Sequence, residues 1–296
     1  MTTTFETMMG RITDGERLGD DDIGALAGTP DILPLGMLAD AMRRRLHGTD
    51  VTFVRVGCCP FAGPFVGAVP PAAREVRITG TPDTTASVLA AVAGARGAAG
   101  DRVVSGFSWT DVERLADGPG GRRSLLADLR VAGLDAFAEL PLDRIDRLDE
   151  VVDLLTEAGF ERLRLTVDSA PAAERAALFV RAAALQGRAG VIQSINPLPM
   201  RIHSLRPTTG YDDVKMVAIA RLALPRIPMV QVDWLRYGPK LAQVALTFGA
   251  DDLDGCPAAD EAPDGRRRAP LEEIRRNIEA AGFHAAERDG RFAVLA

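Results

Sequence analysis

Eight short segments rich in β-forming residues recur along this chain, and helical segments separate most of them. We expect strands at residues 51–57, 75–80, 102–108, 135–141, 162–168, 190–196, 229–234 and 251–255. Apolar residues repeat with a helical period at 83–98, 121–133, 143–159, 170–187, 211–224, 238–249 and 270–281. Such alternation gives parallel strands with right-handed crossovers, and eight units in about 250 residues have the size of a (β/α)8 barrel. The sequence therefore predicts an α/β protein with a TIM-type barrel.

The chain divides into three parts around this barrel. Residues 1–50 contain two expected helices separated by a Gly-Thr-Pro break, and we expect this N-terminal helical cap to cover one end of the barrel. The barrel itself takes residues 51–256. Residues 257–296 begin as a polar, proline-rich loop and continue as a helix and strand extension packed on the barrel. An open doubly wound sheet is the main alternative, but no glycine-rich phosphate turn follows the first strand.

The first crossover departs from the pattern. Residues 57–74 hold two adjacent cysteines, Cys58 and Cys59, together with three glycines and four prolines. Prolines at this spacing exclude a helix. We therefore expect a short, stiff loop that carries the cysteine pair in place of the first helix of the barrel.

The composition argues against a nucleic acid partner, a membrane-spanning segment and secretion. Of the 296 residues, 47% are hydrophobic and 26% are charged, and the net charge is −6. Residues of both charges are interspersed along the chain. No basic stripe is present, so we expect no nucleic acid partner. The sequence shows neither an apolar run of membrane-spanning length nor a signal peptide. Three cysteines do not form a secreted disulfide framework, and we expect a cytoplasmic protein.

Several segments resemble a subfamily of radical S-adenosylmethionine (SAM) enzymes. They are LGDDDIGALAGTPDILPLGMLADAMRRRLHGTDVTFV, RPTTGYDDVKMVAIARLALPRIPMVQVDW, GPKLAQVALTFGADDLDG and LEEIRRNIEAAGFHAAERDGRFAVL. The subfamily contains aminofutalosine synthase and cyclic dehypoxanthinyl futalosine synthase of menaquinone biosynthesis, and it is related to the deazaflavin (FO) synthase. The resemblance implies a radical SAM-like barrel, a link to the futalosine pathway and a protein partner from that pathway.

The cluster loop differs from that subfamily. Its members hold a 4Fe–4S cluster on a CxxxCxxC loop, whereas this chain offers only Cys58 and Cys59, and the SAM-contacting turn is reduced to TGTPD at 79–83. A cluster of this kind needs its cysteinyl ligands. We therefore predict that neither the cluster nor SAM binds in the usual way, and we assign no metal site and no cofactor. An atypical metal or cluster site formed by Cys58, Cys59 and Cys256 is an alternative.

Candidate site residues follow from strand alternation and from the rule that barrel enzymes act at the carboxyl ends of their strands. The candidates for proton transfer are Glu139, Asp168, Asp233 and His203. The candidates for substrate binding are Arg55, Thr166, Ser194, Asn196, Arg206 and Gln231. Arginine suits a carboxylate-bearing ligand through a two-pronged contact. The alternative is an arginine–carboxylate network that fills the barrel.

Two functions remain open at this stage. The chain is either a repurposed, non-radical enzyme that uses acid–base chemistry on a menaquinone precursor, or a non-catalytic binding or scaffold partner of a true radical SAM enzyme. An enzyme is expected to show an open polar pocket with a shifted pKa. A partner protein is expected to show a filled barrel and a large exposed apolar patch.

Overall fold

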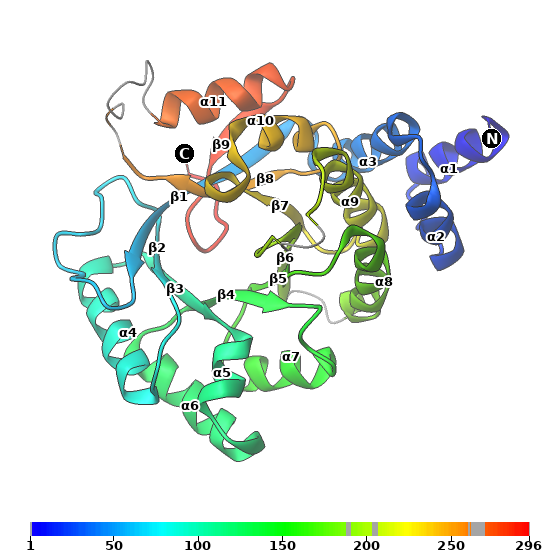
Figure 1. Ribbon diagram of the computed structural model, residues 1–296. Coiled ribbons are helices and arrows are strands. Elements are labelled where there is room, and N and C mark those ends of the chain that lie inside the picture. The colour runs from blue at the N-terminus through cyan, green and yellow to red at the C-terminus, as the bar shows by residue number, and fades with distance from the viewer. Residues whose placement is uncertain (1, 188–190, 203–206, 260, 262–269, 296) are drawn as a thin grey trace.

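The computed structural model describes residues 2–187, 191–202, 207–259, 261 and 270–295, and they form a closed barrel of parallel strands (Figure 1). The strands are β1 (Asp50–Pro60), β2 (Glu75–Thr79), β3 (Val103–Ser108), β4 (Ala136–Pro141), β5 (Leu163–Val167), β6 (Ile192–Pro199), β7 (Met229–Asp233) and β8 (Asp252–Pro257). Both β2 and β8 pair with β1, which closes the ring. The predicted (β/α)8 barrel is confirmed.

Helices surround this ring and follow the strands in order. They are α4 (Thr85–Ala99), α5 (Trp109–Leu115), α6 (Gly118–Ala132), α7 (Leu148–Glu157), α8 (Ala172–Ala183), α9 (Gly210–Ala223), α10 (Trp234–Leu246) and α11 (Pro270–Ala280). Hydroxyl side chains cap several of them: Thr84 and Thr209 each accept a hydrogen bond from a backbone N–H of the first turn. The expected helices are present, and α5 is an additional one.

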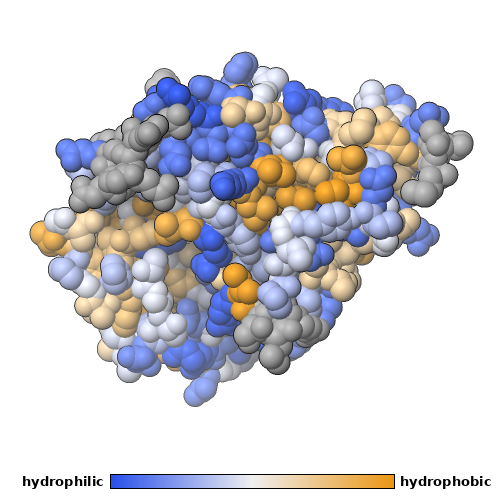
Figure 2. Space-filling view, turned by 45° about the horizontal axis from the view of Figure 1, so that its top comes forward, coloured by the Kyte–Doolittle hydropathy of each residue, from blue (hydrophilic) through white to orange (hydrophobic). Residues whose placement is uncertain are grey.

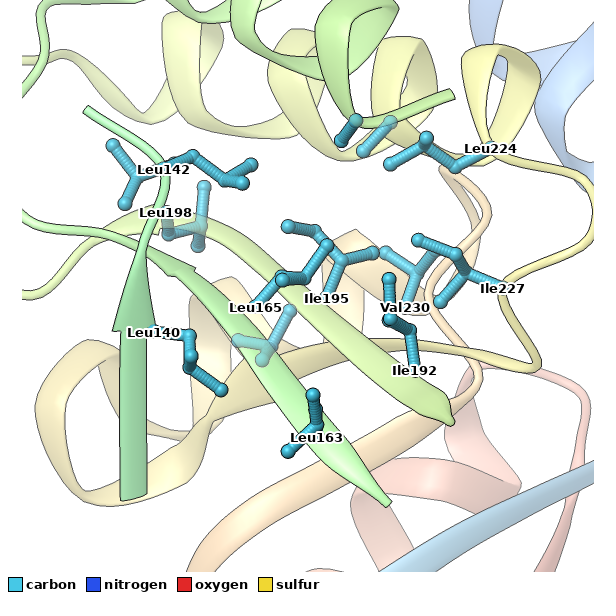
Figure 3. Packing of buried hydrophobic residues seen from close by; sticks show 14 of the residues in the cluster. Leu140, Leu142, Leu163, Leu165, Ile192, Ile195, Leu198, Leu224, Ile227 and Val230 are labelled. Carbon is cyan, nitrogen blue, oxygen red and sulfur yellow. The ribbon is translucent and has the colours of Figure 1, made fainter. Parts of the chain in front are cut away.

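The core lies between the strands and these helices. Leu140 of β4, Leu163 and Leu165 of β5, and Ile195 of β6 extend from the outer side of the strands and pack together (Figure 3). Each of these side chains is at most 2% exposed. Strand alternation then directs the intervening residues, such as Arg164, into the barrel.

The first crossover contains no helix, as predicted, but the cysteine pair does not lie on the loop. Strand β1 continues through Cys58 and Cys59 to Pro60, and the helix-free segment is 61–74. Its Phe65 ring packs so closely on α4 that a Cβ at Gly94 would lie 2.7 Å from it. The loop is therefore fixed to α4 by an aromatic contact that needs a glycine.

The N-terminal helices lie on the outside of the barrel rather than across one end. They are α1 (Thr2–Thr13), α2 (Asp20–Gly28) and α3 (Ile32–His47). Helix α3 packs on α9, α2 packs on α8 and α9, and α1 packs on α3 (Figure 1). The apolar face of α3 includes Leu35 and Leu38, which are fully buried. The two helices expected on either side of the Gly-Thr-Pro break are α2 and α3, and α1 is an additional one. The expected position across one end of the barrel differs from the observed contacts with α8 and α9.

The segment after α11 closes the amino-terminal end of the barrel. Strand β9 (His284–Glu287) pairs in parallel with the start of β1. Arg288 then enters the barrel, where its Nε and Nη2 donate to the two oxygens of Asp252 at 2.6 and 2.7 Å. The ring of Phe292 covers the guanidinium group of Arg288 at 4.1 Å. These contacts form the floor of the barrel.

A second ion-pair group fills the middle of the barrel around Glu75. Its carboxylate is fully buried and accepts two hydrogen bonds from Arg164 at 2.8 and 2.7 Å, two from Arg77 at 3.1 and 2.7 Å, and one from Ser105 at 2.5 Å. Burial alone would raise the pKa of Glu75, but the two guanidinium groups outweigh it and lower this pKa. Arg77 also donates to both oxygens of Asp254 at 2.9 Å.

This group gives a stability prediction. Glu75→Gln keeps the shape of the side chain but leaves Arg164 with uncompensated charge inside the barrel and Arg77 with Asp254 as its remaining carboxylate partner. The change should therefore reduce the free energy of unfolding by about 3 to 5 kcal/mol. Urea denaturation followed by circular dichroism measures this change. Glu157→Gln is the matched control, because Glu157 pairs with Arg123 on the surface, and its loss should cost less than about 1 kcal/mol. Equal effects of the two changes would contradict the prediction.

Candidate functional site

Two carboxyl groups, Glu139 and Asp233, lie at the carboxyl ends of β4 and β7, at the mouth of the barrel. The charges of Arg77 and Arg236 act on both of them, which places the two carboxyls in one electrostatic environment. Arg236 follows β7 in α10 and is about 40% exposed. The mouth therefore combines acids from two strands with an accessible guanidinium group.

Glu139 is a partly buried carboxyl without a compensating partner. It has neither a hydrogen bond nor an ion pair within the part of the chain that the structure describes. Burial raises its pKa, the nearby charge of Asp168 adds to this effect, and Arg236 opposes it. A carboxyl with a raised pKa can hold and release a proton closer to neutral pH.

Asp233 combines a structural contact with a shifted pKa. Its Oδ1 accepts a hydrogen bond from the backbone N–H of Arg236 at 2.9 Å and so caps α10. Burial raises its pKa, and the carboxylate of Asp254 raises it further. Gly255 has a φ of 65°, and a Cβ there would lie 3.0 Å from Oδ1 of Asp233, so the close approach of β8 needs a glycine.

Asp168 also lies at the mouth, but it is held as an anion. It accepts hydrogen bonds from Nε of Arg144 and Nη2 of Arg201, both at 2.7 Å. Burial would raise the pKa of Asp168, but these two arginines lower it. This arrangement suits a residue that positions Arg144 and Arg201 better than one that transfers protons.

The predicted polar residues deeper in the barrel have different surroundings. Gln231 donates to Asp252 at 2.6 Å and belongs to the ion-pair group of the floor. Thr166 and Ser194 are 3% and 0% exposed, and their hydroxyl oxygens have no hydrogen-bond partner among the described residues. Asn196 accepts from the backbone N–H of Leu198 at 3.1 Å. Their roles in substrate binding stay predictions.

Three further candidates do not join this group. Arg55 lies on the side of β1 that faces away from the barrel interior, where its Nε donates to Glu287 of β9 at 2.8 Å. The expectation that it faces the interior is corrected, because β9 brings Glu287 to the outer side of β1. His203 and Arg206 lie outside the described residues.

The cysteines are separated by the alternation of β1. Cys58 is exposed at the mouth, whereas Cys59 belongs to the buried core on the opposite side of the strand. Cys256 of β8 is fully buried. Burial raises the pKa of the Cys59 and Cys256 thiols, and Asp254 raises that of Cys256 further. Within the described ranges, no group of three or more histidine, cysteine or acidic residues could hold a metal ion.

Sequence reasoning missed Arg77 and Arg236 as part of the site. The alternation that directs Arg164, Thr166 and Asp168 to one side of β5 also applies to β2. It directs Glu75, Arg77 and Thr79 to one side of that strand, so the sequence did contain a signal for Arg77. Arg236 follows Asp233 on the first turn of α10, and the sequence alone does not show that this turn borders the mouth.

Among the helices that the structure describes, none combines the length and the apolarity needed to cross a membrane.

Comparison with known proteins shows the relationships of the chain. Residues 191–295 match the family model described as the CofH/MqnC C-terminal region. The chain is 35% identical over 124 residues to a 5-amino-6-(D-ribitylamino)uracil–L-tyrosine 4-hydroxyphenyl transferase of Archaeoglobus fulgidus, which covers 38% of this chain and 36% of that protein. It is 35% identical over 96 residues to an aminodeoxyfutalosine synthase of Streptomyces coelicolor, covering 29% and 24%. These matches thus span about a third or less of the curated relatives' length.

Solved structures agree with the barrel. Methylornithine synthase superposes with a TM-score of 0.65 at 12% identity, over 94% of this chain and 97% of that one. The [FeFe]-hydrogenase maturase HydG gives 0.65 at 12% identity, over 97% and 76%. At such identity the likeness shows the fold alone. Residues 191–295 are thus similar to the CofH/MqnC C-terminal region, part of the chain is similar in sequence to aminodeoxyfutalosine synthases, and the whole chain shares a (β/α)8 barrel fold with these solved structures.

Proposed function

We propose that this protein is a non-radical enzyme of the futalosine type, which transfers protons on a carboxylate-bearing small molecule at the mouth of the barrel. Glu139 carries the proposal, because it is a partly buried carboxyl with a raised pKa and no partner among the described residues. Asp233 is the second acid or base. Arg236 and Arg201 are exposed enough to hold the carboxylate of the ligand.

The donor set supports chemistry without the 4Fe–4S cluster of the resembled subfamily. Three thiolates would have to converge on one cubane. Adjacent residues of a strand point to opposite sides, so Cys58 and Cys59 cannot face the same cluster while β1 keeps its pairing. Cys256 is a buried thiol whose pKa is raised by burial and by acidic neighbours. The residues present do not fit the group, and no step of the proposed reaction involves it.

The absence of converging thiols gives a prediction about the cluster. Anaerobic reconstitution of the protein with iron and sulfide should leave it colourless and without stoichiometric iron, because its thiols neither converge nor ionise readily. Iron analysis and the visible absorption spectrum measure the outcome. A family member with an intact CxxxCxxC loop, treated in parallel, is the positive control. A stoichiometric cluster in this chain would refute the non-radical assignment.

The role of Glu139 in proton transfer gives a prediction about catalysis. Incubation with aminodeoxyfutalosine in heavy water should give deuterium incorporation or a product detectable by mass spectrometry. Glu139→Gln should lower this rate by about a hundredfold or more, because it removes the proton-transferring group. Glu150→Gln is the matched control, since Glu150 is exposed on α7. Equal rates for Glu139→Gln and the native protein would exclude Glu139 from the chemistry.

Glu139 also gives a prediction that does not depend on the substrate. Its pKa is higher in the folded than in the unfolded protein, so its ionised form destabilises the fold above the folded pKa. Glu139→Gln should therefore raise the melting temperature at pH 7. The difference from the native protein should disappear as the pH falls below about 4.3, where the carboxyl is protonated in both states. A lower melting temperature of the variant at pH 7 would contradict the prediction, because it would show that nearby positive charge outweighs the cost of burying the Glu139 carboxylate.

A second candidate function is docking to a true enzyme of the same pathway. Leu33 and Met37 of α3 and Val244 of α10 are 71%, 58% and 46% exposed. Figure 2 shows hydrophobic residues gathered in a band on the face where α10 and α3 lie. If this face binds an aminodeoxyfutalosine synthase, Val244→Glu should weaken that binding by about tenfold in a calorimetric titration. Ser124→Glu on α6 adds the same charge away from this face and serves as the control.

A further inference from the structure

A cavity of about 260 Å³ lies near the floor of the barrel, at the end opposite to Glu139. Four guanidinium groups line it against two carboxylates. They belong to Arg130 of α6, Arg162 and Arg164 at the start of β5, and Arg291 after β9, and the carboxylates belong to Asp135 and Glu161. Three separate segments of the chain thus bring positive charge to one small space.

Arg164 lines this cavity and carries a donor without a partner in the described structure. It is 2% exposed, its two Nη atoms bind Glu75, and Nη2 also reaches the carbonyl oxygen of Gly290 at 3.4 Å. Its Nε–H is buried and has no hydrogen-bond partner in the described structure. Since both Nη atoms are committed to Glu75 and Nε is buried, Arg164 adds positive charge beside the cavity rather than an accessible donor.

Arg162 and Arg291 are the accessible groups of the cavity. The side chain of Arg162 is 44% exposed, and its ion-pair contact is with the neighbouring Glu161 at 3.6 Å. The guanidinium group of Arg291 is exposed and forms no hydrogen bond or ion pair with the residues that the structure describes. Both groups are therefore able to contact a ligand without breaking a strong internal pair.

The backbone around the cavity is strained. Arg162 has a φ of 56° and Phe292 a φ of 66°, and both residues line the cavity. The left-handed region is unfavourable for such side chains and persists only where the surroundings impose it. The ring of Phe292 lies 5.2 Å from the guanidinium carbon of Arg164 and 4.1 Å from that of Arg288. The strained turn thus holds an aromatic ring against the arginines of the floor.

We propose that this cavity binds a small oxyanion, a phosphate or carboxylate group, held by Arg162 and Arg291 beside the buried charge of Arg164. The planar fork of a guanidinium group matches the paired oxygens of such an anion. The volume leaves room for an organic part beside the charged group. This site does not depend on the proposed function, because it lies at the other end of the barrel and shares no residue with the mouth.

Calorimetric titration of the full chain tests the site, with sodium phosphate and with sodium succinate at constant ionic strength. We expect saturable binding of at least one of them. Arg162→Gly should weaken it by about tenfold, and Arg291→Ala should do the same, because each change removes a charge-assisted contact. Glycine suits the positive φ of residue 162, so Arg162→Gly should not lower the melting temperature.

The control variant is Arg123→Ala, which removes an exposed arginine of α6 outside the cavity and should keep the native affinity. Preference for phosphate or for succinate would identify the anionic group, and either preference supports the site. Absence of saturable binding to the native protein would overturn the proposal, and so would equal affinities of all four proteins.

Discussion

The buried ion pair between Glu75 and Arg164 is the interaction on which the interior of this barrel depends. Two charges without access to water are stable only when their hydrogen-bonding groups are matched, and Glu75 achieves this with donors from β2, β3 and β5. Arg77 extends the network to Asp254 of β8. Strands on opposite sides of the ring are thus tied together through charge. The same side chains occupy the space that a ligand would need, so binding is directed to the two ends of the barrel.

This network also determines the electrostatics of the mouth. Arg77 lies near Glu139 and Asp233, but its hydrogen bonds already go to Glu75 and Asp254. Its charge therefore offsets the burial of the two mouth carboxyls only in part, and the pKa of each stays raised. Asp168, which has two arginines of its own, shows the opposite shift. The acids at the ends of β4, β5 and β7 differ in pKa because of their partners, and this difference supports a positioning role for Asp168 and proton transfer by Glu139 and Asp233.

The sequence predicted the barrel well, because alternating strands and periodic helices are local patterns. Alternation also correctly directed Arg164 and Gln231 inward. It could not place Arg55, since the orientation of that residue depends on β9, which pairs with β1 from more than 200 residues further along the chain. The exact end of β1 was missed for a similar reason: Cys58 and Cys59 belong to the strand because they pair with Arg77 and Ile78 of β2. Contacts over long sequence distances decided each of these cases.

Only part of the ion-pair network lies in the region that is similar to the CofH/MqnC C-terminal region. Asp252, Asp254 and Arg288 lie within the matched residues 191–295, whereas Glu75, Arg77 and Arg164 precede them. The matched region thus supplies the carboxylates that anchor the floor and the mouth, and the first part of the chain supplies the charges that join them. The helix-free first crossover lies in that first part, beside β2. Strand β2, which carries Glu75 and Arg77, is held in register by its pairing with β1 and β3, and the packing of Phe65 on α4 fixes the crossover against the helix that follows β2.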